Sequence, residues 1–292
     1  MAETLKMGTM FAPEIVKDVF SKVKGHSALV KLSQQIPVAF SGSDIFTFSM
    51  DDDVNIIAEG GVKPAGSLAL APVHVVPLKV EYGARITDEF MTATEEKQLD
   101  ILSAFNDGYA KKIARGLDLM AMHGINPRDK KTSTLIGTNS FDTATGVSKV
   151  VHVAGSEEDE IETVAAAIGD YDMSGMSVSK AFASTLAKIK VNGVAQYPEF
   201  RFGANPQALG GIPCDVNSTV SAAGNDLLIA GDFASAFKWG YAKEVPFEII
   251  PYGDPDQSGS DLKAHGEIYL RTETYIGWGI LDPTAFARIA TA

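Results

Sequence analysis

Apolar positions in residues 13–24 recur every three or four places, which is the spacing of one face of a helix. Pro13 suits the first turn of such a helix, and Gly25 suits its end. A second short apolar stretch covers residues 29–32. Because this amount of apolar surface is too small for a domain, we expect residues 1–39 to form an arm that docks on another part of the molecule.

The pattern then changes from helical to extended. Residues 45–50 alternate between apolar and polar side chains, and residues 73–82 form a second run that is rich in β-branched residues. Pro72 and Pro77 favour an edge position for the second run, because proline has no N–H to donate. The polar segment between the runs is rich in Asp and Gly, which favour turns. We predict an extended β-hairpin that depends on contacts elsewhere, since a lone hairpin is marginally stable in water.

Residues 94–123 carry the strongest helical pattern of the chain. A capping box begins at Thr92, and Gly124 suits the position just after the last turn. At 1.5 Å per residue the helix is about 45 Å long, more than twice the mean length in globular proteins. Gly108 and Gly116 interrupt it, so either another chain approaches closely there or the helix tolerates them. The apolar stripe consists of Leu99, Leu102, Phe105, Tyr109, Ile113, Leu117 and Met120.

Helical and extended patterns interleave after residue 155. Ser156 suits the N-cap of a helix with an acidic first turn, and Ser179 suits the N-cap of a shorter helix over residues 180–190. Interleaved helices and strands predict an α+β or mixed α/β fold. The β-rich runs are residues 212–216, 226–230, 246–251 and 266–281.

Composition and charge narrow the classes of function. The 292 residues are 45% hydrophobic, contain no apolar run near the ~20 residues of a membrane span, and begin with no signal-peptide pattern. The net charge is −12, and residues 151–292 hold 9 basic against 19 acidic side chains. Tight binding to nucleic acid or to an acidic membrane surface is therefore not expected. The single cysteine, Cys214, excludes an internal disulfide and is expected to be a small buried side chain.

Motifs for catalysis and ligand binding are absent or incomplete. The five histidines are scattered, so the sequence predicts no metal centre, and no glycine-rich motif predicts a nucleotide cofactor. Asp254 and Asp256 open half of a calcium-loop motif, but His265 stands where a glutamate is required. A similar start at residues 51–55 has Ile56 where glycine is required. We expect solvated turns at both places, and we predict no catalytic site and no enzyme activity.

Six short segments carry the closest similarity to a known family. In chain order they are residues 58–64 (AEGGVKP), 75–80 (VVPLKV), 85–90 (RITDEF), 208–213 (ALGGIP), 231–233 (GDF) and 279–286 (GILDPTAF). Together with the order of arm, hairpin, very long helix, mixed region and closing strand, they resemble the Hong Kong 97 type major capsid proteins of tailed bacteriophages.

The resemblance implies an α+β fold with five parts. They are an N-terminal arm (1–39), an extended β-hairpin loop (40–84), a peripheral domain with a long spine helix (85–155), a mixed α/β axial domain (156–255) and a return strand that completes the peripheral domain (256–292). The extended loop is expected to contact neighbouring subunits through Asn55, Ile57, Glu59, Gly60, Gly61, Lys63 and Pro64. The spine helix is expected to pack through Leu99, Leu102, Phe105, Tyr109, Ile113 and Leu117.

The resemblance also implies a virion protein, made and assembled in the cytoplasm of a host bacterium. The chain would assemble with itself into hexamers and pentamers of an icosahedral head that encloses double-stranded DNA without reading its sequence. The expected partners are a separate scaffolding protein, a portal and a decoration protein, with no membrane. Many relatives begin with a helical scaffolding segment; here the arm starts near Met1, so such a segment was either cleaved off or replaced by a separate protein. Lys63 and Lys79 lack the setting of a reactive lysine, so we expect non-covalent shells.

Two other classes of function stay open at this point. The same fold serves encapsulin compartments, which enclose enzymes in place of a genome, so the contents of purified particles discriminate between the two. A soluble α/β enzyme with an unrecognised site is the second alternative, and it would elute as a small oligomer in size-exclusion chromatography.

Overall fold

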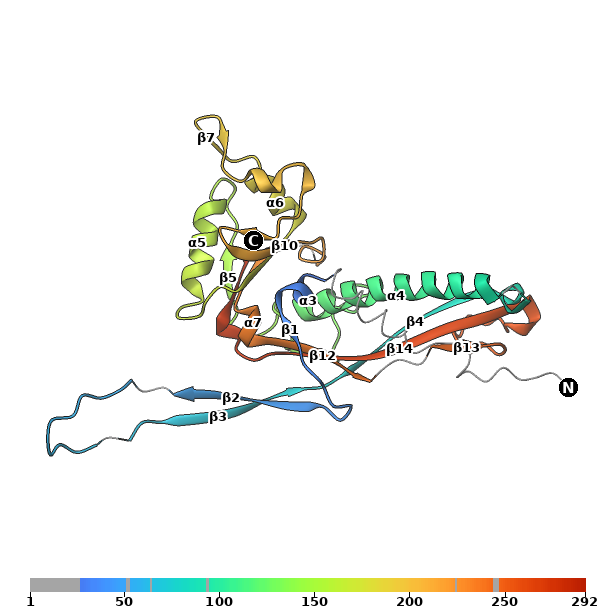
Figure 1. Cartoon of the computed structure of the whole chain (residues 1–292), viewed down its shortest axis with the longest axis horizontal. Coiled ribbons are helices and arrows are strands. Elements are labelled where there is room, and N and C mark those ends of the chain that lie inside the picture. The colour runs from blue at the N-terminus through green and yellow to red at the C-terminus, as the bar shows by residue number, and fades with distance from the viewer. Residues whose placement is uncertain (1–26, 51–52, 64, 93–94, 224, 244–246) are drawn as a thin grey trace.

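The long helix α4 (Glu95–His123) and the long strand β14 (Glu267–Ile280) run side by side along the elongated part of the molecule (Figure 1). The predicted helix over residues 94–123 is thus confirmed, and Gly124 follows it with the left-handed φ of +65°. No described helix has both the length and the apolar character needed to cross a membrane. The computed structural model describes residues 27–50, 53–63, 65–92, 95–223, 225–243 and 247–292.

Strand β14 is the centre of a five-stranded sheet. Along one side, β4 (Leu78–Thr87) pairs antiparallel with Glu267–Ile276. Along the other side lie β12 (Phe237–Lys243) and β13 (Glu248–Ile250), both antiparallel to β14. The short strand β1 (Gln34–Gln35) extends the sheet in parallel with β12. The main hydrophobic core includes residues of this sheet and α4, among them the buried tryptophans of β12 and β14.

A second sheet of six strands has the order β5–β15–β11–β6–β10–β9. It is mixed, because β15 runs parallel to β5 but antiparallel to β11. Apolar side chains of α5 (Glu157–Ala167) and α6 (Lys180–Leu186) pack on it in a separate core. The strands are β5 (Ser148–Val151), β6 (Gly175–Val178), β9 (Ala208–Leu209), β10 (Ile212–Val216), β11 (Asp226–Gly231) and β15 (Phe286–Ala290).

The remaining elements are short, apart from the two strands of a hairpin. These two sheets with their helices confirm the mixed α/β class predicted from the alternating pattern. The hairpin strands are β2 (Ser43–Met50) and β3 (Leu68–Val75). The short elements are α3 (Ala28–Leu32), η1 (Asp88–Thr92), β7 (Lys190–Val191), β8 (Val194–Ala195), η2 (Pro198–Gly203), α7 (Phe233–Ala236), η3 (Lys263–His265) and η4 (Pro283–Ala285).

Helix α3 docks on α4 through a buried carboxylate. Both oxygens of Asp118, a fully buried residue of α4, accept hydrogen bonds from the start of α3: the backbone N–H groups of Ala28 (3.1 Å) and Leu29 (3.3 Å) and the hydroxyl of Ser27. Thr219 donates a further bond of 2.8 Å. Because four buried donors meet one carboxylate, this contact fixes where the N-terminal segment enters the fold. The prediction that this segment docks is confirmed for its described part.

The second predicted β run, residues 73–82, divides into two strands. Strand β3 ends at Val75 and pairs with β2, whereas β4 begins at Leu78 and pairs with β14. Pro77 lies between them, and its missing N–H interrupts the hydrogen-bond ladder. The second strand of the hairpin is therefore residues 68–75. The prediction of a hairpin is confirmed, but the position predicted for its second strand, residues 73–82, was wrong.

Two predicted helix caps have different outcomes. Ser179 has the extended ψ of 151° and accepts a hydrogen bond of 3.2 Å from the N–H of Phe182. Ser156 precedes α5 as predicted, but its ψ of 21° is not extended and its side chain makes no capping bond. The predicted helix over residues 13–24 lies outside the described residues, as do the side chains of the capping box at Thr92.

Candidate subunit-contact surface

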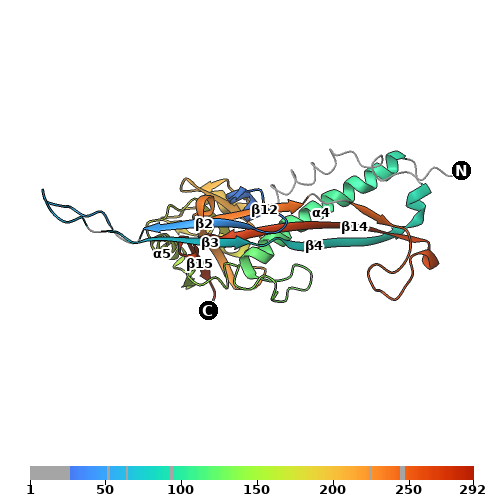
Figure 2. The same ribbon diagram turned by 90° about the horizontal axis from the view of Figure 1, so that it is seen from below.

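The hairpin of β2 and β3 projects away from both sheets as a two-stranded ribbon (Figures 1 and 2). Its antiparallel register places Phe46 opposite Pro72 and Phe48 opposite Leu70. Paired residues share a face of a ribbon because side chains alternate along each strand. These four residues therefore form one apolar strip, which we call the ribbon face.

The ribbon face is exposed to solvent. Phe46 is 61% exposed, Phe48 is 59% exposed and Leu70 is 60% exposed, and Pro72 is also exposed. Apolar side chains gathered in a strip of this kind mark a site where another molecule binds. The backbone of each strand is paired with that of the opposite strand, so the four side chains keep this alignment along the ribbon.

The base of the ribbon is anchored, unlike its outer part. Val75 is fully buried against β14, where two glycines leave room for it. A Cβ atom on Gly277 would lie 3.0 Å from Val75 Cγ1, and one on Gly279 would lie 2.9 Å from Val75 Cγ2. The absence of side chains at these two positions of β14 therefore fixes the point from which the ribbon departs.

The predicted contact residues of the extended loop lie at the tip of the ribbon. A turn there has a backbone hydrogen bond of 2.9 Å from Gly61 N to Ala58 O, with Gly60 at a φ of +78°. Apolar neighbours at the tip are also uncovered, and Ile56 is 99% exposed. Pro64 lies outside the described residues. The exposed members of the predicted set are Asn55, Ile57, Glu59, Gly60, Gly61 and Lys63.

The predicted packing residues of the spine helix face the first sheet. Tyr109, Ile113 and Leu117 are buried in the main core. The Tyr109 hydroxyl lies 2.6 Å from Thr274 Oγ1 of β14, and burial raises its pKa to about 12. The side chain of Leu99 lies outside the described residues. A smaller cluster nearer the start of the helix contains Leu102, Ile268 and Leu270, with Phe105 packed against it.

The loop that begins with Asp254 and Asp256, where the sequence has half of a calcium-loop motif, surrounds the guanidinium group of Arg85. Arg85 of β4 donates to Asp254 Oδ1 (2.8 Å), to Asp256 Oδ2 (2.9 Å) and to Glu267 Oε2 (3.1 Å). The positive charge of Arg85 holds the pKa of Asp256 well below its usual range. The acidic side chains of this loop therefore have an internal counter-ion. The expectation of a solvated turn was incomplete, because the turn also wraps a charged side chain from another strand.

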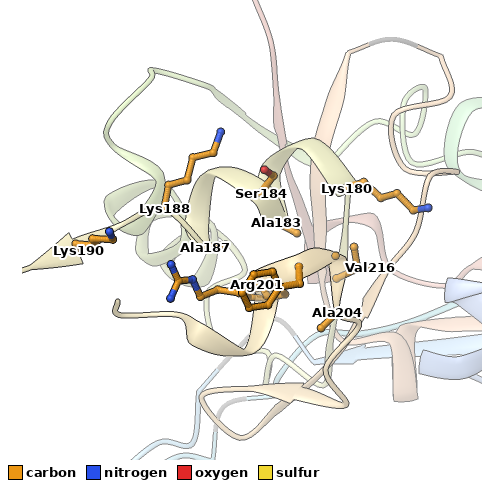
Figure 3. Close-up of a pocket in the computed structure, with 12 residues that line it drawn as sticks. Lys180, Ala183, Ser184, Ala187, Lys188, Lys190, Arg201, Ala204 and Val216 are labelled. Atoms are coloured by element: carbon orange, nitrogen blue, oxygen red, sulfur yellow. The ribbon is translucent and has the colours of Figure 1, made fainter. Parts of the chain in front are cut away.

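A hollow of about 620 Å³ in the second sheet's domain carries positive charge (Figure 3). Lys180, Lys188, Lys190 and Arg201 line it, and Arg201 also lies over the fully exposed ring of Phe202 at 5.8 Å. No histidine, cysteine or carboxylate is among the described residues that line it. The hollow therefore attracts anionic groups. No pattern in the sequence indicated it, because its charges come from α6, from the turn after α6, from β7 and from η2.

One group of described residues has the chemistry of a metal site. His123, Asp142 and Asp226 bring one potential ligand atom each to within 4.8 Å of one another. The three residues are far apart in the sequence and form no ligand motif, so the sequence predicted no metal centre here. The fold, and not a motif, brings the three together.

By its fold, the protein is a mixed α/β subunit with a long helix and an exposed apolar ribbon. No family model matches the sequence, and no curated protein matches it. A solved chain of Mycobacterium phage Ogopogo is similar with a TM-score of 0.76 and 29% identity, over 91% of this chain and 92% of that chain.

Two further solved structures share the fold. A chain of Gordonia phage Cozz has a TM-score of 0.69 and 21% identity, over 100% of this chain and 91% of that chain. A chain from the capsid of an empty GTA particle has a TM-score of 0.65 and 14% identity, over 91% and 90%. The predicted resemblance to bacteriophage major capsid proteins is therefore confirmed.

Proposed function

We propose that the chain is the major capsid protein of an icosahedral phage head, in which the ribbon face of one subunit lies on a neighbouring subunit. The exposed apolar strip of Phe46, Phe48, Leu70 and Pro72 carries this proposal. A strip of this kind favours burial against a partner, because removing apolar surface from water is favourable. In a shell of identical subunits, the partner is a second copy of the same chain.

The geometry of the ribbon favours a heterologous contact, in which one patch meets a different patch on the next copy. The ribbon projects from one end of the subunit, so it reaches outward to a neighbour (Figure 2). Heterologous contacts close into rings when the rotation allows it. We propose hexamers and pentamers around the domain that contains the second sheet. The five parts 1–39, 40–84, 85–155, 156–255 and 256–292 then have the roles given by the family resemblance, except that β12 and β13 lie in the first sheet, whereas β5 and β15 lie in the second.

The charge of the chain suits a container for DNA. With a net charge of −12 the wall does not hold phosphates tightly, which suits double-stranded DNA that is enclosed and later released. As the family resemblance implies, we propose that the DNA is enclosed without sequence-specific binding. We propose a virion location, with assembly in the host cytoplasm guided by a separate scaffolding protein, and with a portal and a decoration protein as further partners.

Replacing the tip of the ribbon tests this function. Residues 55–66 are exchanged for a short Gly-Ser linker, and the full chain is expressed with its scaffolding protein. We expect loss of closed particles in electron microscopy and sedimentation, with cooperative thermal unfolding retained, because the tip adds little to its own subunit's core. Particles in normal yield would contradict the role of the loop. Native particles that hold enzymes and no DNA would favour the encapsulin alternative.

Covalent linkage between subunits is not expected. Lys63 lies exposed at the tip, and Lys79 is engaged with Glu273, whose Oε1 lies 2.7 Å from its Nζ. Mature particles boiled in denaturant should therefore run as single chains on a gel, and a ladder of linked subunits would refute the expectation.

A further inference from the structure

Three side chains converge where α4 meets the second sheet. His123 is the last residue of α4, Asp142 lies in the loop that follows, and Asp226 is the first residue of β11. His123 Nδ1 lies 2.9 Å from Asp142 Oδ2 and 3.6 Å from Asp226 Oδ2. The three atoms come from different segments, so an ion among them would join the long helix to the second sheet.

Each carboxylate divides its two oxygens between two neighbours. Oδ1 of Asp142 and Oδ1 of Asp226 accept hydrogen bonds from Arg288 Nη1, at 2.9 and 2.6 Å. The two Oδ2 atoms are left facing His123. Asp226 is only 1% exposed, and no N–H or hydroxyl group of the described residues donates to its Oδ2. Burial and the neighbouring carboxyl of Asp142 hold the pKa of Asp226 above its usual range, so a proton shared between the two carboxyls is the alternative to an ion at this place. A buried carboxylate oxygen without a donor needs another partner.

The imidazole of His123 is held in the orientation typical of a metal ligand. Its Nε2 lies 2.9 Å from the carbonyl oxygen of Thr219, so Nε2 carries a hydrogen and donates it. This leaves Nδ1 to face the two carboxylates. Metal-bound histidines almost always donate their other N–H to a carbonyl or carboxylate in this way, which fixes the tautomer and the ring plane.

The distances suit a small divalent ion. With bonds of about 2.0–2.1 Å, ligand atoms lie about 3.4 Å apart around a tetrahedral ion and about 3.0 Å apart around an octahedral one. The observed separations of 2.9 and 3.6 Å span these values. The side chain of Asp142 is 22% exposed, which provides a path for the ion and a place for water as a further ligand.

We infer that His123, Asp142 and Asp226 bind one divalent ion of the zinc class within each subunit. When both carboxyl groups are ionised, they and Arg288 together leave one negative charge facing the imidazole, which attracts a cation. One nitrogen and two oxygens suit zinc and its transition-metal neighbours. Calcium prefers six to eight oxygen ligands, so it fits less well.

The test is a titration of the purified full chain with zinc chloride, and with calcium chloride in parallel. After dialysis, we expect one zinc per chain by elemental analysis, with little calcium, and zinc should raise the temperature of unfolding. Asp226→Asn keeps an oxygen that can accept the hydrogen bond from Arg288, and it removes the negative charge and the Oδ2 atom that faces His123. Losing a residue that only supports a metal ligand usually weakens metal binding 10- to 100-fold. Losing a ligand itself should therefore weaken zinc binding at least 10-fold.

His152→Gln is the matched control. His152 Nδ1 lies 2.9 Å from Glu160 Oε2 and forms a histidine–carboxylate pair outside the three-residue group, so its loss should leave zinc binding unchanged. If Asp226→Asn does not fold, Asp142→Asn serves in its place, because that side chain is partly exposed. No zinc binding by the wild type, or equal binding by the carboxylate variant, would overturn the inference. The site lies within one subunit, so the test does not depend on assembly.

Discussion

Making the ribbon face polar should block assembly without unfolding the subunit. The double variant Phe48→Ser/Leu70→Ser changes two directly paired residues in the middle of the strip. Both side chains are exposed in the single subunit, so their own fold loses little when they become polar. Surface substitutions of this kind usually change the free energy of unfolding by no more than about 0.5 kcal/mol.

The loss at the interface is larger. Burying a Leu or Phe side chain completely contributes about 1.5–3 kcal/mol. About three-fifths of Phe48 and Leu70 is left for a neighbour to cover, so each side chain contributes about 1–2 kcal/mol. The pair then contributes about 2–4 kcal/mol per ribbon contact, or roughly 30- to 900-fold in the association constant. Every subunit donates one such contact, so the loss repeats across the whole shell.

The assay compares three chains expressed with the scaffolding protein. Analytical ultracentrifugation measures the fraction in particles, and thermal unfolding measures the subunit. The control Ala69→Ser/Ala71→Ser introduces the same polar residue on the opposite face of the ribbon, at the β3 positions on either side of Leu70, and it should assemble like the wild type. Normal particle yield from Phe48→Ser/Leu70→Ser, or equal loss in the control, would refute the assignment of this face as the contact.

Three further predictions concern stability and helix packing. Burial raises the pKa of Asp118 from 3.8 to about 6, so the native state holds this proton more tightly than the unfolded chain does. Its contribution to the unfolding free energy should therefore fall by up to about 3 kcal/mol as pH rises from about 4 to about 6. Urea unfolding should lose this slope in Asp118→Asn, and an unchanged slope would contradict the assignment. Gly108→Ala, which places a Cβ where no atom of the described residues outside the helix's own backbone lies within 4 Å, should raise stability by up to about 1 kcal/mol. Retained assembly would show that the helix merely tolerates this glycine, and lost assembly would show that another chain packs there. Gly240→Ala, whose Cβ would lie 1.9 Å from the carbonyl oxygen of Ile36, should lower stability by about 1–3 kcal/mol, and unchanged thermal unfolding would contradict this packing.

Local sequence patterns were sufficient to predict an element when its own residues determine its secondary structure. The helix over Glu95–His123 has a long apolar stripe and a terminal glycine, so periodicity alone located it within one residue at its start. The first strand of the hairpin was also located, because residues 45–50 alternate between apolar and polar side chains as an extended strand does. The expected burial was wrong in the single subunit, because Phe46 and Phe48 face solvent and not a core. In both cases neighbours along the chain carry the signal.

The features that the sequence patterns did not predict depend on contacts between segments that are far apart in the chain. Residues 73–82 look like one strand, but β14 takes the part after Pro77 as its own partner. The short strand β15 was not predicted, although Phe286 and Ile289 are fully buried, because five residues carry too little periodicity. The group of His123, Asp142 and Asp226 depends on segments that only the completed fold brings together.

Two strands that come late in the described chain join earlier segments in both sheets. Strand β14 pairs with β4, β12 and β13, and strand β15 lies between β5 and β11. During synthesis on the ribosome, neither sheet is complete until residues 267–290 have been made. The ribbon emerges before that, when the sheet from which it departs is not yet assembled. Folding of each subunit therefore waits for these two strands, and this order delays the exposure of a complete contact surface until they have been made.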